Sequence, residues 1–517
     1  MNTPISDDLV GQRQRRIEKV KELRALGINP YPSLSQKDVV NTEILNNFEH
    51  YEGKKLTLAG RLISWREHGK LIFADIQDQS GKIQLWLKQD GVKGELSKGY
   101  LNWEQLKLLD AGDYVQATGV VVKTSRGAVS LDVSEIRILA KSLRPLPQKL
   151  EEKEQLVRKR YLDLTLHPEK KALFIRKAKF YEVQREFLLS KGFMEVETPV
   201  LEHVTGGGDA RPFATHHNFL DEDFYLRIST ELYQKRLIGA GFEKIFTIGP
   251  NFRNEGLSDE HLQEYYQIEW YWAFANYRDN MSLVKELFRE IAQKVYGKTE
   301  FETRGHKFDL ASEWQEISYP NIIKEKLGID IFKDSDEKML TVLKAQNVKL
   351  SGEINRSRLV DNLWKTIRKT ISGPAFLVNE PKFMSPLAKS KDSDESITER
   401  FHVILAGSEL GNGYTEINDP QDQLERFMEQ QKLREAGDDE AQMLDLDFVE
   451  MLEYAMPPTS GYGQSERIFW YLENVTAREG TLFPQLSADY NPLELKVYGE
   501  SVLKHTKAFA KENKKAK

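Results

Sequence analysis

The sequence predicts an α+β protein in which a small β-barrel precedes a larger domain of mixed helices and strands. The chain has 517 residues, more than one hydrophobic core usually spans, so two or three domains are expected. Residues 54–141 alternate apolar and polar side chains with the two-residue period of β-strands. The later sequence mixes this period with helical spacing, and 40% hydrophobic with 30% charged residues is the composition of a globular protein.

The composition excludes several classes of protein. The sequence has no cysteine, which excludes disulfides, thiolate zinc sites and a cysteine nucleophile. No apolar run reaches the roughly 18 residues of a membrane span. The N-terminal segment "MNTPISDDLVGQRQRRIEK" lacks the apolar stretch of a secretory signal. We therefore expect a cytoplasmic protein with no membrane partner.

Basic residues are unevenly distributed over a chain that is acidic overall. The net charge of −6 argues against a generally basic surface for nucleic acids. Three basic clusters nevertheless stand out, at 13–24, 157–161 and 504–517. They fit contact with a phosphate backbone, and they fit solvated helix faces or a frayed chain end at least as well. For the last cluster we prefer the second interpretation.

The N-terminal part of the chain predicts a helix followed by the barrel. Residues 11–27 have helical character and end at a glycine and two prolines, so residues 1–53 are expected to form a helical extension. Residues 54–141 contain five strand candidates separated by Gly or Ser turns: "KKLTLAGRLISW", "KLIFADIQD", "KIQLWLKQ", "DYVQATGVVVK" and "VSLDVSEIRIL". Five strands in about 90 residues favour an OB-type barrel, a fold that often binds single-stranded nucleic acid. A barrel without such a ligand fits the strand pattern equally well.

A second, larger domain is expected over residues 166–490. Residues 142–165 are rich in proline and charge and predict a linker before it. Helical spacing that begins near Phe174 ends at Gly192, and "MEVETPVL" predicts a strand broken by Pro199.

Further strands are expected through residues 224–277 and again through 402–418. Residues 305–400 interrupt this series of strands with a mixed sequence of partly helical character, which predicts an insertion. Residues 491–517 predict a basic C-terminal tail.

The segment "NFRNEGLSDEHLQEYYQIEW" (251–270) brings Arg253, Glu255 and His261 to one strand–loop–strand hairpin. An arginine offers a fork of donors and a protonable histidine adds a second cation, which suits a triphosphate. A lone Arg–Glu pair is more often a structural salt bridge. The hairpin alone therefore leaves both interpretations open.

Three glutamates, Glu231, Glu269 and Glu416, are expected within apolar, aromatic-rich strands. A buried carboxylate is costly unless it is paired. Either these glutamates meet arginine and lysine from within the protein, or they meet a cationic amine substrate beside a nucleotide. The residues alone do not decide between the two.

Seven stretches resemble those of class II lysyl-tRNA synthetases and follow the order of that family. Three of them resemble the first, second and third motifs of the class: "GFMEVETPVL", "FRNEG…H…EYYQIEWY" and "GYGQSERIF". The other four resemble stretches typical of the lysine enzymes: "GGGDARPFATHHN", "LRISTELYQKRL", "MSPLAK" and "ELGNGYTEINDPQDQLERF". The resemblance covers nearly the whole chain. It implies an antiparallel-sheet catalytic domain, preceded by an OB-fold anticodon-binding domain at residues 54–141.

The resemblance also implies an activity and its partners. The family attaches L-lysine to tRNA(Lys) through a lysyl-adenylate formed from ATP, with Mg²⁺ as the metal. A homodimer formed through the first motif is implied as well.

Roles for individual residues follow from the same resemblance. The two expected catalytic residues are Arg253, on the ATP α-phosphate and the substrate carboxylate, and Arg467, on the triphosphate. The expected ATP-binding residues are Arg253, Glu255, His261, Tyr265, Glu409, Gly463 and Arg467. The expected lysine-binding residues are Gly207, Glu231, Glu269, Tyr271, Asn412, Tyr414 and Glu416, with Glu231 on the α-amino group and Glu416 on the side-chain ammonium. The expected anticodon-binding residues are Arg61, Phe73, Gln84 and Glu135, and the expected metal ligands are Glu409 and Glu416.

This sequence departs from the family pattern at three places. The third motif is one residue shorter than usual and carries Ser465 in its second half, which leaves the path of the glycine turn and the role of Gly463 open. In the second motif, Leu262 and Gln263 stand where Asn and Pro are usual. Asp209 stands at a place that is usually small and apolar.

Three alternatives stay open at this point. An aspartyl or asparaginyl enzyme would need basic or neutral groups where this chain has Glu269 and Glu416. A paralogue that lysylates a protein would lack the barrel. A non-catalytic synthetase paralogue that binds tRNA would be indicated by loss of Arg253, Arg467 or Glu409, all of which are present.

Overall fold

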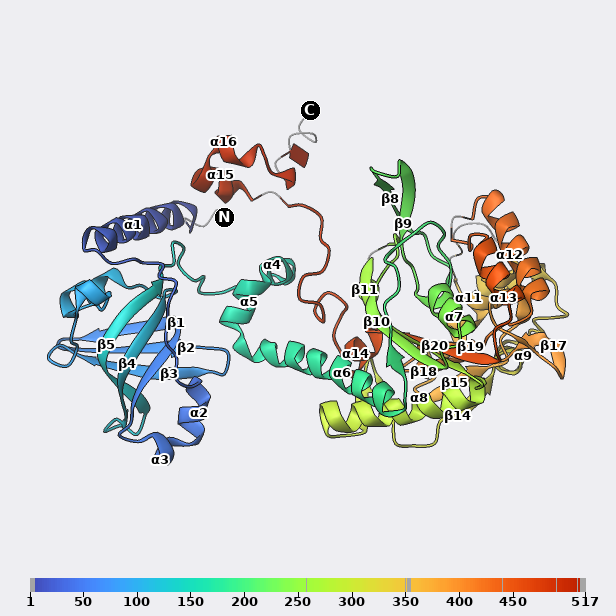
Figure 1. Ribbon diagram of the computed structural model, residues 1–517, viewed down its shortest axis with the longest axis horizontal. Helices are drawn as coiled ribbons and strands as arrows, with labels where there is room; N and C mark the ends of the chain where they lie inside the picture. Colours follow the sequence, from blue (N-terminus) through green and yellow to red (C-terminus); the bar gives the residue numbers. More distant parts are fainter. Residues whose placement is uncertain are drawn as a thin grey trace. The chain divides into compact units, whose positions relative to one another are not determined.

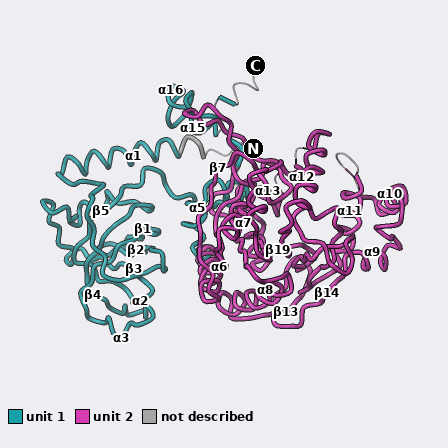
Figure 2. Tube along the Cα trace, turned by 45° about the vertical axis from the view of Figure 1, so that its right-hand side comes forward, with its two compact units in different colours: residues 1–169, 486–517 teal, residues 170–485 magenta. Residues whose placement is uncertain are grey.

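The computed structural model describes residues 5–511 except 257, 349, 351–354, 439, 490 and 509. The chain forms two compact units, residues 1–169 with 486–517 and residues 170–485 (Figure 2). None of the helices in the described ranges has the length and apolar character needed to cross a bilayer.

The first unit is built on the predicted five-stranded barrel (Figure 1). Its strands are β1 (Lys55–His68), β2 (Leu71–Gln77), β3 (Lys82–Lys88), β4 (Tyr114–Lys123) and β5 (Val129–Ala140). They close in the order β1-β2-β3-β5-β4, and only the β3–β5 pair is parallel. The 3₁₀ helices η1 (Leu96–Lys98) and η2 (Trp103–Leu108) lie between β3 and β4. Alternate side chains of each strand point inward, which is why the two-residue period could be read from the sequence.

The N-terminal segment is part of the barrel core and does not form a separate extension. It consists of α1 (Ile5–Ala25), α2 (Asn41–Asn46) and α3 (Phe48–Tyr51). Leu23, Ile28 and Ile44 of this segment share one buried cluster with the barrel strands. The basic face of α1 is partly structural, since Arg16 donates to the carbonyl oxygens of Ser142 and Ala111 at 3.0 Å.

The predicted linker and the predicted tail both contain helices. α4 (Lys153–Arg158) and α5 (Arg160–Leu166) occupy much of the linker, followed by η3 (Pro168–Lys170). The buried Asp163 stabilises α5, because it lies 3.0 Å from Arg160 and 2.9 Å from His167. The tail contains α15 (Pro492–Tyr498) and α16 (Glu500–Leu503) and belongs to the first unit. Residues 509 and 512–517 of the predicted basic tail lie outside the described residues.

The second unit is organised around an eight-stranded sheet with the order β14-β15-β18-β19-β20-β11-β10-β6. The strands are β6 (Met194–Glu195), β10 (Lys244–Phe252), β11 (Glu264–Ala273), β14 (Gln315–Ser318), β15 (Ala375–Val378), β18 (Arg400–Leu405), β19 (Ser408–Thr415) and β20 (Thr459–Ser465). Neighbouring strands are antiparallel except at the two edges, where β14–β15 and β10–β6 are parallel. The predicted antiparallel-sheet domain is thus confirmed.

Helices cover both faces of this sheet (Figure 1). Trp270 and Tyr271 are neighbours on β11 and belong to different buried clusters, one on each face. The Trp270 cluster includes residues of α6 (Lys171–Ser190), α8 (Tyr277–Ile291), the π-helix η4 (Ala292–Tyr296) and α14 (Arg467–Leu472). The Tyr271 cluster includes residues of α7 (Glu231–Gly239), α12 (Pro420–Glu435) and α13 (Leu446–Glu453).

The predicted insertion at 305–400 is only partly separate from this sheet. Its strands β14 and β15 form one edge of the sheet, so the prediction of a plain insertion is wrong for them. Its helices α9 (Tyr319–Leu327), α10 (Asp336–Ala345) and α11 (Arg356–Arg368) share a third buried cluster with residues of β15 and β18.

Smaller strands complete the unit. The three-stranded sheet contains β7 (Leu201–Glu202), β8 (Phe213–His217) and β9 (Glu222–Leu226). Two hairpins are β12 (Glu300–Thr303) with β13 (His306–Asp309), and β16 (Ser390–Lys391) with β17 (Asp394–Thr398), the second preceded by η5 (Lys382–Met384). The predicted strand around Pro199 is present as two short strands, β6 and β7, on either side of that residue.

Candidate active site

A cavity of about 440 Å³ lies in the second unit. Strands β11, β18, β19 and β20, helix α7, the loop before β8 and the loop between β10 and β11 contribute residues to its lining. All fourteen residues predicted for ATP and lysine line it: Gly207, Glu231, Arg253, Glu255, His261, Tyr265, Glu269, Tyr271, Glu409, Asn412, Tyr414, Glu416, Gly463 and Arg467. The "MSPLAK" stretch also contributes to the lining. The fold therefore brings together predicted residues from Gly207 to Arg467, which are far apart in the sequence.

Two buried carboxylates converge on one ammonium in this cavity. Glu231 and Glu416 are 5% and 1% exposed, and the Nζ atom of Lys235 lies 2.6 Å from Glu231 Oε1 and 2.5 Å from Glu416 Oε2. The Tyr414 hydroxyl donates a further hydrogen bond of 2.6 Å to Glu231 Oε1. Glu231 is the first residue of α7, which corrects its expected position in a strand.

The ionisation of this group follows from burial and from the neighbouring charges. Burial raises the pKa of the Glu416 carboxyl, and the charge of Glu231 raises it further, against the opposing effect of Lys235. Burial lowers the pKa of Lys235, but the two carboxylates outweigh burial and raise it overall. Lys235 is therefore an ammonium, and the group carries an excess negative charge only when Glu416 is ionised.

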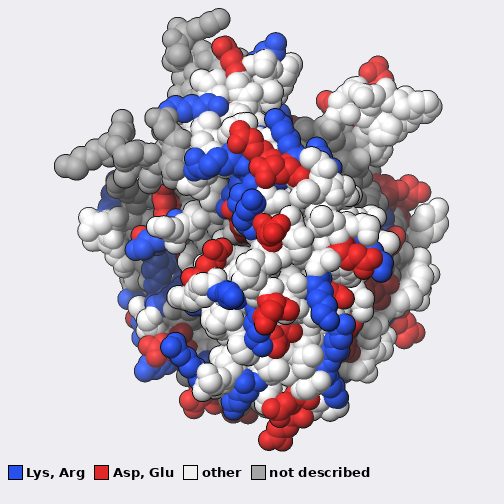
Figure 3. All heavy atoms as spheres, turned by 90° about the vertical axis from the view of Figure 1, so that its left-hand side faces the viewer, with Lys and Arg blue, Asp and Glu red and all other residues white. Residues whose placement is uncertain are grey.

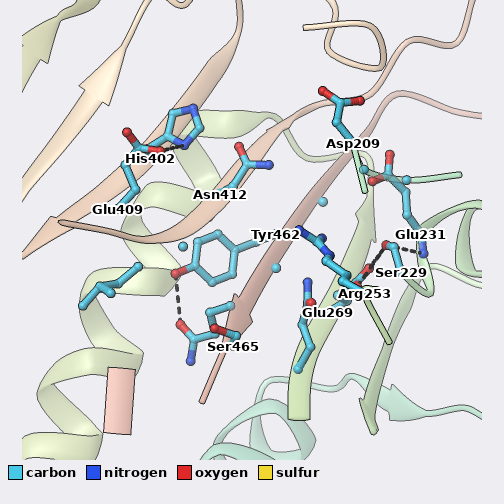
Figure 4. Close-up of a pocket in the computed structure, with 18 of the residues that line it drawn as sticks. Asp209, Ser229, Glu231, Arg253, Glu269, His402, Glu409, Asn412, Tyr462 and Ser465 are labelled. Carbon is cyan, nitrogen blue, oxygen red and sulfur yellow. Dashed lines mark hydrogen bonds and ion pairs between the residues drawn. The ribbon is translucent and has the colours of Figure 1, made fainter. Parts of the chain in front are cut away.

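The third buried carboxylate, Glu269, lies beside Arg253 (Figure 4). Glu269 accepts hydrogen bonds of 3.0 Å from the Ser229 hydroxyl and 3.3 Å from Asn251. Arg253 makes no side-chain hydrogen bond or ion pair with the described residues, and its Nε atom is buried without a partner. Its guanidinium carbon lies 5.8 Å from the centre of the Tyr265 ring. An uncommitted guanidinium in a cavity is suited to an anionic ligand.

Arg467 lies in another part of the cavity lining. Its guanidinium lies 2.8 Å from Glu260 Oε2 and donates to Ser408 Oγ at 2.9 Å. His261 lies on the same loop as Glu260, and its Nδ1 is 2.8 Å from Ser258 Oγ. Burial and the charge of Arg467 lower the pKa of His261. The histidine is therefore neutral near pH 7, which corrects its expected role as a second cation.

Glu409 and His402 lie together, away from Glu231, Ser229 and Glu269 (Figure 4). Burial raises the pKa of Glu409, but His402 and Arg368 outweigh it and lower this pKa to about 2. Glu409 Oε1 accepts from Trp364 Nε1 and lies 3.2 Å from Arg368 Nη1, whereas Oε2 lies 3.8 Å from His402 Nδ1. Glu409 is a fully ionised carboxylate with one oxygen less committed than the other.

The predicted pair of metal ligands is not supported as one site. Glu409 and Glu416 are seven residues apart along β19 and its end, on the order of 20 Å in an extended strand, whereas Mg²⁺ binds oxygens at about 2.1 Å. Glu416 is also paired with Lys235. No group of three or more acidic or histidine side chains that could hold a metal occurs among the described residues. The structure favours Glu416 as a partner for ammonium groups.

The shortened third motif forms a continuous strand. β20 runs through Thr459–Ser465 and pairs with both β11 and β19, so no separate glycine turn is needed. A Cβ on Gly461 would lie 2.4 Å from Glu416 Oε1 and 2.4 Å from the Tyr271 ring. Gly463 pairs with Glu269 and Asn412 across the sheet. Because Gly461 has no side chain, Glu416 and Tyr271 can pack directly against the backbone of β20.

The altered loop of the second motif is anchored by the residues that replace Asn and Pro. Leu262 is 5% exposed and belongs to the main buried cluster. Gln263 donates from its side chain to the Glu255 carbonyl oxygen at 3.0 Å, and its own carbonyl accepts from the Arg253 amide at 2.8 Å. Asp209 of the first loop lines the cavity rather than a remote surface, near Arg400 and Arg253.

Two family models match the chain. Residues 152–487 match the tRNA synthetases class II (D, K and N), and residues 56–139 match the OB-fold nucleic acid binding domain. A lysine–tRNA ligase from Thermotoga maritima is 42% identical over 483 residues, which cover 91% of this chain and 95% of the relative. A lysine–tRNA ligase from Thermosipho africanus is 43% identical over 483 residues, which cover 91% of this chain and 95% of the relative. One from a Roseiflexus species is 40% identical over 484 residues, which cover 92% of this chain and 98% of the relative.

The chain belongs to the class II lysyl-tRNA synthetases. The predicted family and the predicted order of domains, barrel first and catalytic sheet second, are thus confirmed.

The barrel of this synthetase presents an aromatic pair on its outer face. Phe73 and Trp86 are opposite each other on β2 and β3, with ring centres 6.3 Å apart and planes within 8°. Lys88 Nζ lies 3.7 Å from the centre of the Trp86 ring. Gln84 is two positions from Trp86 on the same face and accepts from the Ser130 hydroxyl at 3.0 Å.

The two other predicted anticodon residues lie apart from this aromatic pair. Arg61 is opposite Gln77, four residues from Phe73 and so roughly 13 Å along the strand. Its guanidinium donates to Gly112 and Tyr114. Glu135 lies on β5, five residues beyond Ser130, roughly 16 Å along that strand. Positive and negative side chains are interspersed over the face of the molecule in Figure 3.

Four residues that contact predicted site residues were not themselves predicted from the sequence: Trp86, Lys235, Glu260 and His402. Two of them had a readable signal. Trp86 alternates with Gln84 in "KIQLWLK", and Lys235 follows Glu231 by one helical turn in "ELYQKRL". Glu260 and His402 had none, because their partners come from distant parts of the chain.

Proposed function

We propose that this synthetase attaches L-lysine to tRNA(Lys) in two steps, through a lysyl-adenylate. The observation that carries this proposal is the buried pair Glu231 and Glu416, both within 2.6 Å of the ammonium of Lys235. When both carboxyls are ionised, the two carboxylates and the one internal ammonium leave one negative charge in a place shielded from water. A single substrate ammonium compensates that charge, whereas an acidic or neutral side chain does not.

The positions of the three carboxylates support an orientation for the substrate. The α-amino and carboxylate groups of an amino acid are close together, so the residues that bind them must be neighbours. Glu269 and Arg253 are such neighbours. We therefore assign Glu269 to the α-amino group and Arg253 to the substrate carboxylate. Glu231 then joins Glu416 at the side-chain ammonium, in place of the α-amino role first expected for it.

The same arginine also serves the first chemical step. The substrate carboxylate attacks the α-phosphorus of ATP in line, the bond to the β-phosphate oxygen breaks, and pyrophosphate leaves. Arg253 holds the attacking carboxylate and the α-phosphate in one place, and Arg467 holds the leaving phosphates. Positioning and charge stabilisation of this kind account for phosphoryl transfer without a side-chain nucleophile. In the second step the terminal adenosine hydroxyl of tRNA attacks the lysyl carbonyl, and AMP leaves.

The remaining cavity residues are assigned to the nucleotide. Tyr265 stacks on adenine, and Glu255 lies at the adenine and ribose end. His261 reaches the terminal phosphates as a neutral hydrogen-bond donor, consistent with its lowered pKa. Gly463 lets the β20 backbone approach the nucleotide. Tyr271, Asn412, Tyr414 and Gly207 complete the lysine pocket.

One carboxylate of the cavity is suited to Mg²⁺. Mg²⁺ is commonly held by one or two carboxylates together with substrate phosphates and waters. Glu409, ionised and with Oε2 the less committed of its oxygens, meets this requirement. The ion would neutralise charge on the ATP phosphates during their transfer.

The barrel is assigned to the anticodon. Phe73 and Trp86 offer a stacking surface for unpaired bases, and Gln84 offers an amide beside it for a base edge. Arg61 and Glu135 are kept as anticodon residues for bases farther along the barrel.

A homodimer is proposed from the segment of the first motif. Apolar side chains are exposed along it, including Ile175 at 66%, Leu189 at 50% and Leu201 at 44%. Such side chains are suited to a subunit interface. Light scattering that gives the mass of a monomer would contradict this assignment. Because tRNA and ATP are its substrates, we place the enzyme in the cytoplasm.

The test of the proposed function is ATP–pyrophosphate exchange with each of the twenty amino acids, in the absence of tRNA. Exchange confined to lysine is expected. Exchange with aspartate or asparagine would contradict the assignment of Glu231, Glu269 and Glu416. Exchange with no amino acid would favour a tRNA-binding paralogue without catalysis.

A further inference from the structure

A carboxylate of the protein itself lies on the arginine assigned to the triphosphate. Glu260 Oε2 is 2.8 Å from Arg467 Nη2, and Glu260 Oε1 is in contact with Arg304 Nη1. Glu260 and Arg467 line the cavity, whereas Arg304 is not part of its lining. Glu260 therefore bridges one arginine inside the cavity and one outside it.

The surroundings keep this carboxylate ionised and both arginines in place. Burial raises the pKa of Glu260, but Arg467, Tyr471 and Arg304 outweigh it and lower this pKa below its usual value. The Arg304 guanidinium lies 3.7 Å from the centre of the Tyr471 ring, and that of Arg467 lies 6.0 Å from it. A guanidinium stacked this closely on an aromatic ring has a fixed position independent of Glu260.

A carboxylate and a phosphate compete for the same guanidinium donors. We propose that Glu260 is an internal competitor of ATP, which occupies Arg467 in the free enzyme and is displaced onto Arg304 when the triphosphate binds. This inference rests on the proposed function, because it takes Arg467 as the triphosphate ligand. It assigns Glu260 as a residue that sets the affinity for ATP and does not itself contact the reacting atoms.

The arrangement predicts opposite effects for the two partners of Glu260. Removing the carboxylate frees Arg467 and removes a negative charge facing the phosphates, so ATP should bind more tightly. Removing Arg304 takes away the second partner and leaves Glu260 on Arg467 alone, so ATP should bind more weakly. The pair is partly exposed, and exposed ion pairs contribute up to about 1 kcal/mol, which corresponds to a change of about fivefold in each direction.

The experiment is calorimetric titration of the full-length protein with ATP, without lysine or tRNA. Glu260→Gln is expected to lower the Kd for ATP by about fivefold, Arg304→Gln to raise it, and the double variant to behave like Glu260→Gln. Asp259→Asn is the matched control, because Asp259 is an exposed carboxylate on the same loop without an ion pair among the described residues. The gain in Glu260→Gln should shrink at high ionic strength, an effect that loss of a purely structural contact would not produce.

Three results would overturn the inference. An unchanged or higher Kd in Glu260→Gln would mean that the carboxylate positions Arg467 and does not compete with ATP. An equal gain in Asp259→Asn would reduce the effect to the general charge of the loop. A loss from Arg304→Gln that persists in the Glu260→Gln background would make Arg304 a direct phosphate ligand. Lysine-dependent exchange is measured separately, so failure of the proposed function and failure of this inference give different results.

Discussion

The replacement Glu416→Gln tests the central electrostatic feature of the site. Glutamine keeps the size of the side chain and removes its charge. Lys235 then stays paired with Glu231 alone, 2.6 Å away, and these two charges cancel. The substrate ammonium would lose its compensating charge and one charged hydrogen-bond partner. Hydrogen bonds to charged groups contribute about 1.5–3 kcal/mol, so the KM for lysine should rise by about ten- to a hundredfold.

The assay is ATP–pyrophosphate exchange at saturating ATP, with lysine varied. The KM for ATP should stay within about twofold of the wild-type value, because Glu416 is assigned no contact with the nucleotide. Glu202→Gln is the matched control, since Glu202 is a buried carboxyl outside the cavity lining. Thermal unfolding of both variants separates loss of binding from loss of fold. A KM for lysine within threefold of wild type in a folded Glu416→Gln protein would refute the reasoning.

Further predictions concern the two ends of lysine, the pH dependence and the barrel. The compound 6-aminohexanoate lacks the α-amino group of lysine, so Glu231→Gln should weaken its inhibition of exchange. Glu269→Gln should leave that inhibition unchanged and still raise the KM for lysine. The reverse pattern would restore the α-amino role to Glu231. Burial and Glu231 raise the pKa of Glu416 to about 8, and only the ionised carboxylate attracts the ammonium. The KM for lysine should therefore fall as the pH rises from about 6.5 to about 8.5, and Glu416→Gln should abolish this dependence; a wild-type KM that rises over this range would contradict the assignment. Phe73→Ala and Trp86→Ala should each weaken tRNA aminoacylation by about 1–3 kcal/mol per lost stacking contact and leave exchange intact; equal loss in both assays would make the aromatic pair a structural element of the barrel.

The barrel could be predicted from the sequence because its signal is local. Each strand alternates inward and outward side chains, and its turns carry Gly or Ser, so all five strands were found. The edge strand β14 and its neighbour β15 were missed within the predicted insertion for the opposite reason. They have four residues each, and β15 is buried along its whole length, so it shows no alternation. Their place in the sheet depends on pairing with each other and on the contact of β15 with β18.

The N-terminal segment shows a similar limit. Its helical pattern was readable, but Leu23, Ile28 and Ile44 join the barrel core through contacts with residues far along the chain. Nothing in the local sequence separates such a segment from an independent extension. The predicted tail is comparable, since its Tyr498 lies 5.7 Å from Arg13 and 5.5 Å from Arg144.

The residues of the cavity were predicted as a set, but their pairing was not. The motifs identify which side chains face the substrates, and all fourteen line the cavity. The pairing of each carboxylate with a cation depends on distances between helices and strands that are far apart in the sequence. Lys235 on α7 reaches Glu416 at the end of β19, and this contact agrees with the predicted ammonium role of Glu416 and disagrees with its second predicted role as a metal ligand.

The count of buried charges explains why this cavity favours lysine over the substrates of the related enzymes. When all three are ionised, Glu231, Glu269 and Glu416 contribute three negative charges, and Lys235 and Arg253 contribute two positive ones, which leaves one negative charge. Lysine, with two ammonium groups and one carboxylate, brings the total to zero. Asparagine would leave the excess in place and aspartate would double it, and an uncompensated buried charge is strongly destabilising. The internal ammonium of Lys235 is essential to this balance, because without it one lysine would not neutralise the three carboxylates. Lys235→Met should therefore raise the KM for lysine although it removes a competing cation; a lower KM in a folded Lys235→Met protein would mean that Lys235 merely occupies the place of the substrate.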